Sequence, residues 1–133
     1  MKNFGLVRSI ESFYVGFSDE TTIPVLKLLK HGFRHCFVFF GDENYTFVLD
    51  PISNRLDLSF LPLGVGQMLK LFALNNIKIV YVPKRFEVNK VSSTGIFTCV
   101  EVVKRILGIS KFSIITPYRL YSFLNNTNNF PEN

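Results

Sequence analysis

The chain has 133 residues, 47% of them hydrophobic, and a formal net charge of +5. Its mean hydropathy of +0.24 excludes a disordered protein, and its length fits one domain with a well-buried core. The positive charge favours an anionic partner such as nucleic acid, a membrane surface or cell-wall polymer. The basic residues are scattered along the chain, however, as they are on an ordinary solvated surface.

Cys36 and Cys99 are the two cysteines of the chain. No CxxC or His-x-His grouping accompanies them, so the sequence predicts neither a disulfide framework nor a metal site, and we expect no cofactor. Reduced thiols in a reducing compartment are the simplest interpretation. No stretch reaches the roughly 18 apolar residues of a membrane span, and Glu11 interrupts any apolar run near the N-terminus. We therefore expect no membrane span and no signal peptide.

The N-terminal part of the chain predicts one helix. Residues 4–17 mix apolar and polar positions without a clear period and fit either a short strand or an extended lead-in. From Ser18 to Gly32, helix-capping residues, a proline suited to a first turn and an apolar stripe predict a short amphipathic helix that ends at the glycine. His31 lies in its last turn, where a capping role is the simplest interpretation.

The stretch at 33–50 predicts two strands joined by a tight turn, because both arms are rich in Phe, Val, Tyr and Leu and the break has turn composition. With Asp42-Glu43 at the tip, His35 lies directly opposite Asp50. Their Cβ atoms are then roughly 4.5–5.5 Å apart on one face, within hydrogen-bonding reach. The second strand is expected to end at Asp50, because Pro51 has no N–H to donate to a ladder.

Three further elements are predicted up to residue 82. The stretch from Arg55 to Phe60 alternates apolar and polar side chains, which predicts a third antiparallel strand with one wet face. Gly64 and Gly66 precede a predicted helix over Gln67–Leu74. The stretch from Ile77 to Val82 is β-branched enough to form a fourth strand.

The second cysteine lies at the start of a predicted helix, after a polar, irregular stretch at 83–95. Over Phe97–Leu107, apolar residues recur at helical spacing and place Cys99 on the inward stripe, with Gly108 as the C-cap. Thr116-Pro117 then begins a last predicted helix, which runs to Leu124.

These elements predict a single α+β domain over residues 1–124, followed by a frayed Asn-rich tail at 125–133. Its expected architecture is an antiparallel β-sheet of about four strands packed against a central helix that begins at the Cys99 region, with short flanking helices.

Cys99, His35 and Asp50 are the candidate catalytic residues. In the first turn of a helix, unpaired N–H groups and the positive end of the dipole stabilise a thiolate and lower the thiol pKa. A histidine whose ring is oriented by a carboxylate can act as the base that activates a nucleophile. The backbone N–H of Cys99 would stabilise an oxyanion during acyl transfer.

The order histidine, acid, cysteine resembles the papain-like cysteine hydrolases in their circularly permuted, NlpC-like arrangement. The matching segments are short: Thr98-Cys99-Val100-Glu101-Val102-Val103 resembles the start of the permuted helix, and His35-Cys36, Asp50-Pro51, Leu107-Gly108-Ile109 and Thr116-Pro117 resemble small proteins of phages and alphaproteobacteria. The resemblance implies a hydrolase or acyltransferase acting on an amide or ester, for example in cell-wall peptide, with Cys99 as nucleophile, His35 as base and Asp50 as orienter.

Two other functions remain open. The first is a non-catalytic, phage-type structural or assembly protein that keeps the papain-like fold and binds protein partners. No polar residue equivalent to the oxyanion glutamine of the papain-like family can be assigned, which favours this alternative. The second is a nucleic-acid binder, which rests on charge alone because no helix-turn-helix or aromatic RNA-binding signature is present. The expected location is accordingly the cytoplasm or the virion.

Each candidate residue also has a purely structural interpretation. Cys99 on an apolar stripe can serve as a small core residue, and Asp50 before a proline can form an Asx-type turn. Cys36 is expected to point to the opposite strand face from His35 and to pack in the core. Glu101 is most simply an i,i+4 ion-pair partner of Arg105.

Overall fold

A computed structural model gives the fold of the chain and describes residues 10, 12–19, 32–52, 55–86 and 98–126. The helix predicted between Ser18 and Gly32, including His31, lies almost entirely outside the described residues. The same holds for residues 87–95 of the predicted loop and for residues 127–133 of the tail.

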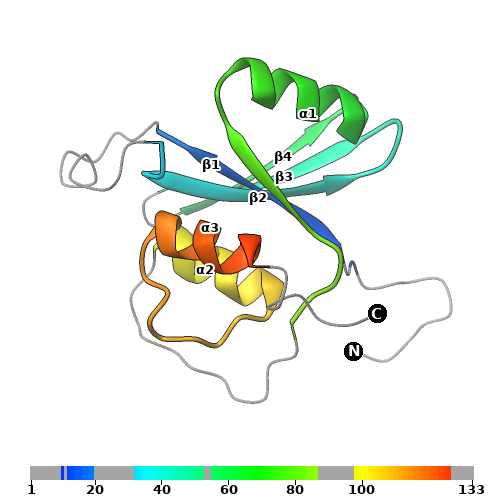
Figure 1. Cartoon of the computed structure of the whole chain (residues 1–133). Coiled ribbons are helices and arrows are strands. Elements are labelled where there is room, and N and C mark those ends of the chain that lie inside the picture. The colour runs from blue at the N-terminus through cyan, green and yellow to red at the C-terminus, as the bar shows by residue number, and fades with distance from the viewer. Residues whose placement is uncertain (1–9, 11, 20–31, 53–54, 87–97, 127–133) are drawn as a thin grey trace, which may run out of the picture.

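The described part of the chain contains one antiparallel sheet of five strands, in the order β4-β3-β2-β1-β5 (Figure 1). The strands are β1 (Phe13–Ser18), β2 (His35–Gly41), β3 (Thr46–Ile52), β4 (Arg55–Leu61) and β5 (Lys78–Val82). The predicted α+β class is confirmed, but the sheet has five strands and not about four. The additional strand is β1, which lies between β2 and β5.

Helices cover both faces of the sheet (Figure 1). The helix α1 (Val65–Leu74) lies on one face, where the Phe72 ring contacts the rings of Phe37 and Phe39. The helices α2 (Cys99–Leu107) and α3 (Pro117–Asn125) lie on the other face. The molecule thus has three layers with the sheet in the middle, and α2 packs directly on β2 and β3.

Strand β1 alternates its side chains between the two faces, as a buried central strand must. Phe13, Val15 and Phe17 are buried in the core shared with α2 and α3. On the α1 face, Gly16 pairs with Phe37, and a Cβ atom on this glycine would lie 2.3 Å from Cζ of the phenylalanine ring. The glycine therefore lets the Phe37 ring lie against the backbone of the neighbouring strand.

The helix boundaries follow from local capping chemistry. The Thr98 hydroxyl accepts a hydrogen bond from the Glu101 N–H at 3.2 Å, and Thr116 does the same for Arg119 at 3.2 Å. Gly108 ends α2 in the left-handed conformation, with φ 80°. These caps agree with the predicted ends of both helices, except that α2 begins at Cys99, two residues later than expected.

The β2–β3 hairpin has a wider loop than predicted, running from Asp42 to Tyr45. Oδ1 of Asp42 accepts hydrogen bonds from the N–H groups of Asn44 at 2.8 Å and Tyr45 at 2.9 Å. Phe40 consequently pairs with Phe47 and not with Tyr45. The predicted register, which placed His35 directly opposite Asp50, is wrong by two residues. An even shift keeps both side chains on the same face, because side chains alternate with a period of two.

Strand β3 also continues past its predicted end at Asp50. Its pairing with β2 runs from Thr46 to Leu49, whereas its pairing with β4 runs on to Ile52. Pro51 is buried within this extension. At this position β3 pairs with β4 alone, as an edge strand pairs with a single neighbour. A proline, which has no N–H to donate, is tolerated in such a strand.

Helix α2 is buried more completely than its sequence pattern predicts. Glu101 and Lys104, expected to face away from the core, are 7% and 2% exposed. Lys104 Nζ donates to Glu101 Oε1 and to the Ile114 carbonyl oxygen, both at 3.1 Å. The predicted ion pair between Glu101 and the exposed Arg105 is therefore wrong, because the segment leading into α3 encloses this side of the helix.

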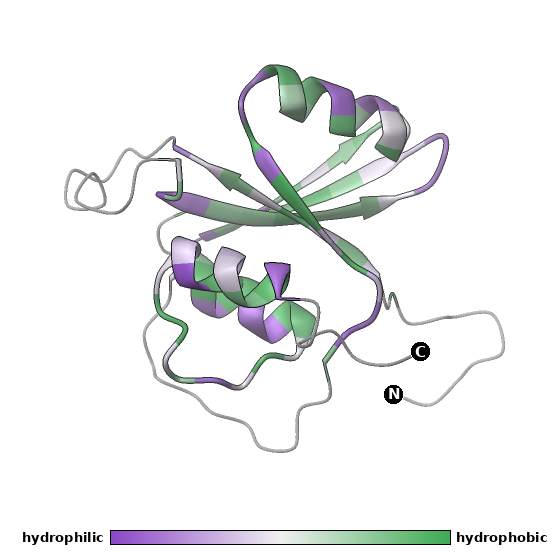
Figure 2. Ribbon diagram, in the orientation of Figure 1, coloured by the Kyte–Doolittle hydropathy of each residue, from purple (hydrophilic) through white to green (hydrophobic). Residues whose placement is uncertain are grey.

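Strands β3 and β4 leave an apolar strip uncovered on the face that carries α2. Figure 2 shows apolar residues along these strands and a hydrophilic hairpin loop at their end. The strip consists of five exposed side chains: Tyr45, Phe47, Leu56, Leu58 and Phe60. The Phe47 and Phe60 rings are directly paired, with centroids 5.0 Å apart. The sequence predicted one wet face for β4, but most of both faces is exposed.

Candidate active site

His35 and Asp50 meet at the open end of the β2–β3 hairpin. Nε2 of His35 lies 2.5 Å from Oδ1 of Asp50, although the two residues are not directly paired in the ladder. An ionised carboxylate can only accept, so the imidazole donates this hydrogen bond from Nε2. Both side chains remain partly accessible, at 18% exposed for His35 and 34% for Asp50.

Hydrogen bonds from the end of β1 fix the chain where it enters β2. The Asp19 carboxylate accepts from the Gly32 N–H at 2.7 Å and from Arg34 Nη1 at 3.2 Å, and the Arg34 N–H donates to the Ser18 carbonyl oxygen at 3.0 Å. These contacts tie the residue before His35 to the neighbouring strand. The backbone at His35 is thereby held in place, which fixes the position from which the imidazole ring projects.

Cys99 is the first residue of α2 and is partly buried. Its sulfur lies beside the thiol and backbone N–H of Cys36 and beside the His35 ring. The Cys36 thiol makes the largest contribution to lowering the pKa of Cys99, burial acts in the opposite direction, and His35 lowers it further. The outcome is a pKa of about 5, compared with an ordinary value of 9.0, so Cys99 is a thiolate at neutral pH.

The His35 ring is the cationic partner of this thiolate. Burial alone would lower the pKa of His35, but the hydrogen bonds with Asp50 and Cys99 and the charges of both groups outweigh it and raise the pKa from 6.5 to about 9. Because Nε2 is occupied by Asp50, Nδ1 is the nitrogen left for the Cys99 sulfur. The three predicted catalytic residues are thus brought together in the order Asp50, His35, Cys99.

Cys36 is the member of the site that sequence reasoning missed. It was predicted to pack in the core, and it is fully buried there. It also lies beside the Cys99 sulfur, and burial, followed by the interaction with Cys99, raises its pKa well above the ordinary value, so it stays protonated. Its position directly after His35, on the helix-facing side of β2, is the sequence signal that points to this contact.

A second carboxylate lies next to the site. Asp57 on β4 pairs directly with Asp50 on β3, and two like charges in this position repel each other. Arg55 forms a 2.7 Å ion pair from Nε to Oδ1 of Asp57. The guanidinium offsets the charge of Asp57, which leaves Asp50 as the carboxylate that bonds to His35.

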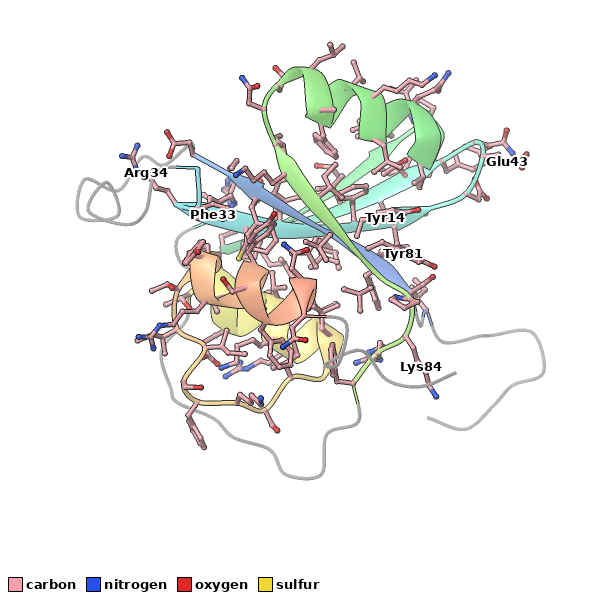
Figure 3. The ribbon with its side chains drawn as sticks, in the orientation of Figure 1. Tyr14, Phe33, Arg34, Glu43, Tyr81 and Lys84 are labelled. Atoms are coloured by element: carbon pink, nitrogen blue, oxygen red, sulfur yellow. The ribbon has the colours of Figure 1, made fainter. Side chains whose placement is uncertain are left out.

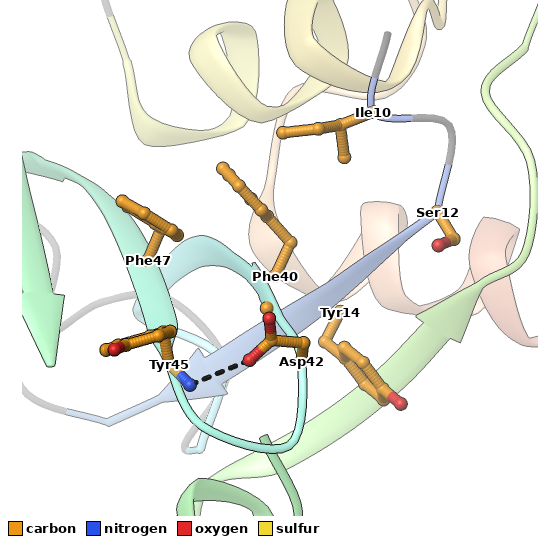
Figure 4. A pocket seen from close by; sticks show the side chains of 8 residues that line it. Ile10, Ser12, Tyr14, Phe40, Asp42, Tyr45 and Phe47 are labelled. Carbon is orange, nitrogen blue, oxygen red and sulfur yellow. Dashed lines mark hydrogen bonds between the residues drawn. The ribbon is translucent and has the colours of Figure 1, made fainter. Parts of the chain in front are cut away.

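A small cavity lies at the opposite end of the hairpin from the three residues. Figure 3 labels Phe33 and Arg34 where β2 begins and Glu43 at the far end of the sheet. The cavity has a volume of about 280 Å³ and lies beside the loop, where Phe40, Asp42, Tyr45 and Phe47 line it (Figure 4). Five residues of strand separate His35 from Phe40, roughly 17 Å, so this cavity is not part of the site.

The described part of the chain shows neither a metal-binding group of side chains nor a membrane-spanning helix. No group of three or more His, Cys, Asp or Glu side chains there is arranged to hold a metal ion. Among the same residues, no helix is long and apolar enough to cross a membrane.

A scan against protein-family models, a search of curated proteins and a search of solved structures found no match to this chain.

Proposed function

We propose that this protein is a cysteine-nucleophile hydrolase or acyltransferase that acts on an amide or ester bond. The observation that carries the proposal is the continuous set of contacts from Asp50 through His35 to Cys99. The permuted papain-like order of these residues, with the nucleophile at the head of a helix packed on an antiparallel sheet, supports the same assignment. Cell-wall peptide is the substrate class that the resemblance implies.

In the first step, the Cys99 thiolate attacks the carbonyl carbon of the substrate. The developing oxyanion lies at the positive end of α2, where the Cys99 N–H has no intrahelical partner and can donate to it. His35, protonated at neutral pH, then gives its Nδ1 proton to the leaving amine or alkoxide. The products of this step are a thioester on Cys99 and a neutral imidazole.

In the second step, the neutral His35 accepts a proton from water or from another acceptor as it attacks the thioester. Release of the acyl group regenerates the thiolate and the imidazolium. Asp50 keeps Nε2 protonated throughout, which directs Nδ1 to Cys99 and stabilises the cationic ring. Water as the acceptor gives hydrolysis, and an amine or alcohol gives acyl transfer.

The proposal is tested with p-nitrophenyl acetate, an activated ester that needs no specific binding pocket. We expect a burst of nitrophenol and an acetyl group on Cys99, located by peptide mass spectrometry. His35→Ala should slow acylation at neutral pH by up to about 10²-fold, because losing the cationic ring raises the pKa of Cys99 towards its ordinary value of 9.0 and lowers the thiolate fraction. Asp50→Asn should slow it by a smaller factor.

The matched control is Lys70→Ala, an exposed position on α1 outside the site, which should acylate at the parent rate. Cys99→Ser should lose both the burst and the acetyl group. If acetylation spreads over surface lysines in parent and variants alike, with none on Cys99, then Cys99 is not a nucleophile. Circular dichroism of each variant separates a loss of chemistry from a loss of fold.

A second candidate function is that of a non-catalytic assembly protein. The observation that favours it is the exposed apolar strip on β3 and β4, since exposed apolar surface of this kind marks protein contacts. In that case Cys99→Ala should still assemble with its partners or bind them as the parent does. Loss of function by folded Cys99→Ala would exclude this alternative.

A further inference from the structure

Cys36 is a nucleophilic group that the proposed acyl transfer does not use. Its thiol is fully buried, so no dissolved reagent can reach it directly. The Cys99 sulfur is a nucleophilic neighbour of this thiol, since Cys36 belongs to the buried cluster against which Cys99 packs, at the contact of β2 with α2. Cys99 itself is partly accessible. In this pair, Cys99 can react with a dissolved reagent, whereas Cys36 can react only with Cys99.

This arrangement matches the requirements of a two-step oxidation. An accessible thiolate reacts with peroxides, and an adjacent thiol can then capture the sulfenic acid before further oxidation. Cys36 and Cys99 lie on elements that pack directly on each other, β2 and α2, and both belong to one packed cluster. Both cysteines are free in this structure, which corresponds to the reduced state of the pair.

We propose that Cys36 is the resolving thiol for Cys99, so that oxidation by hydrogen peroxide produces an intramolecular Cys36–Cys99 disulfide. This modification would reversibly remove the thiolate from the site. It goes beyond the proposed acyl transfer and needs no acyl substrate, so either can hold without the other.

In the first step, the Cys99 thiolate attacks one oxygen of hydrogen peroxide. The S–O bond forms as the O–O bond breaks, and the departing hydroxide takes a proton from the imidazolium of His35 to leave as water. The sulfur of Cys99 is oxidised to a sulfenic acid, and the peroxide is reduced.

In the second step, the sulfur of Cys36 attacks the sulfur of the sulfenic acid and gives up its proton as it does so, since oxidation has removed the Cys99 charge that helped to keep Cys36 protonated. The S–S bond forms as the S–OH bond breaks, and the hydroxyl group leaves as water with the proton from Cys36. An added dithiol such as dithiothreitol returns both thiols by exchange. Burial of Cys36 restricts the reaction to this one pair and prevents disulfides between molecules through Cys36.

The test treats the full chain with hydrogen peroxide at neutral pH, followed by alkylation and mass spectrometry without reduction. The expected product is lighter by about 2 Da and yields a linked peptide pair containing Cys36 and Cys99, which dithiothreitol abolishes. In Cys36→Ser, Cys99 should gain about 32 Da as the sulfinic acid, and dithiothreitol should not reverse this gain. Cys99→Ser should show neither change.

The proposal is overturned if the folded parent accumulates sulfinic acid on Cys99 without the linked peptides. It is also overturned if Cys36→Ser and the parent give the same products. Where Cys36→Ser fails to fold, Cys36→Ala takes its place, with circular dichroism as the check. If neither variant folds, mass spectrometry of the digested parent protein still shows whether the linked Cys36–Cys99 peptides form. Acylation by p-nitrophenyl acetate is measured on the same samples, so failure of the nucleophile and failure of the resolving thiol are told apart.

Discussion

Three titratable side chains meet in the site, and at neutral pH one of them is deprotonated and two are protonated. Cys99 is deprotonated, His35 is protonated, and Cys36 keeps its proton. The cause is mutual: the Cys99 thiolate raises the pKa values of His35 and Cys36, and these two protonated neighbours lower the pKa of Cys99. Asp50 adds negative charge behind the ring and fixes which nitrogen faces the sulfur.

The pH dependence of alkylation by iodoacetamide follows from these states. Cys99 becomes protonated as the pH falls through about 5, so the rate should rise between pH 4 and 6 and then level off. A thiol with the ordinary pKa of 9.0 would instead react slowly throughout this range. In His35→Ala the rise should move to higher pH, because the cationic partner is lost.

The pH profile of the turnover rate should also fall at high pH, whereas the profile of the alkylation rate should not. His35 loses its proton as the pH rises through about 9, and the neutral ring can no longer protonate the leaving group. The rate of acylation should therefore fall above that pH. Asp50→Asn should move this fall to lower pH, because it removes the carboxylate that raises the pKa of His35. An unchanged fall in that variant would contradict the assigned role of Asp50.

At the scale of elements, α2 joins the chemistry to the core. Its first residue, Cys99, is the proposed nucleophile, and its inner faces hold the buried pair of Glu101 and Lys104, which is anchored to the Ile114 carbonyl oxygen. A buried pair is costly to break because the remaining charge has no partner. The pair therefore fixes how the segment at 109–114 wraps around the helix.

Lys104→Met should destabilise the protein by about 3–5 kcal/mol, since it strands the Glu101 carboxylate in the core. Adding Glu101→Leu should recover part of that loss by removing the stranded charge. Arg105→Met on the exposed side of the same helix is the matched control and should change stability by no more than about 0.5 kcal/mol. Urea denaturation measures all three. Equal effects of the Lys104 and Arg105 variants would refute the buried pair.

At the scale of the whole molecule, the three layers are unequally covered. The core between the sheet and α2 and α3 holds Phe17, Leu107 and Leu120, all fully buried. Strands β3 and β4, at one edge of the sheet, leave the apolar strip in solvent. Stability therefore depends on the covered part of the sheet, and the strip contributes little to it.

Leu120→Ala and Leu58→Ala remove the same atoms from the two environments. The side chain of Leu120 is 0% exposed and that of Leu58 is 69% exposed. We expect a loss of about 2–5 kcal/mol for Leu120→Ala, which leaves a cavity. For Leu58→Ala we expect a change within about 0.5 kcal/mol. Thermal and urea unfolding at low protein concentration provide the comparison, and similar losses would show that the strip is covered in solution.

The sequence by itself determined the features that depend on neighbouring residues. Thr98, Gly108 and Thr116 set their helix ends through bonds or dihedral angles within a few positions, so these boundaries were predictable to within two residues. The alternation of β2 and β3 likewise placed His35 and Asp50 on one face, and that prediction survived an even error in register. Local chemistry and a period of two suffice for such features.

Tertiary structure alone decided the rest. Strand β1 became central because Gly16 accommodates the Phe37 ring, a contact between residues distant in sequence. The segment leading into α3 turned Glu101 and Lys104 into buried residues. The contact of Cys36 with Cys99 joins a strand to a helix from the other end of the chain. Contacts between distant segments cannot be read from a periodic pattern in the sequence. Each segment has the same local pattern of apolar and polar residues whether or not its partner packs against it.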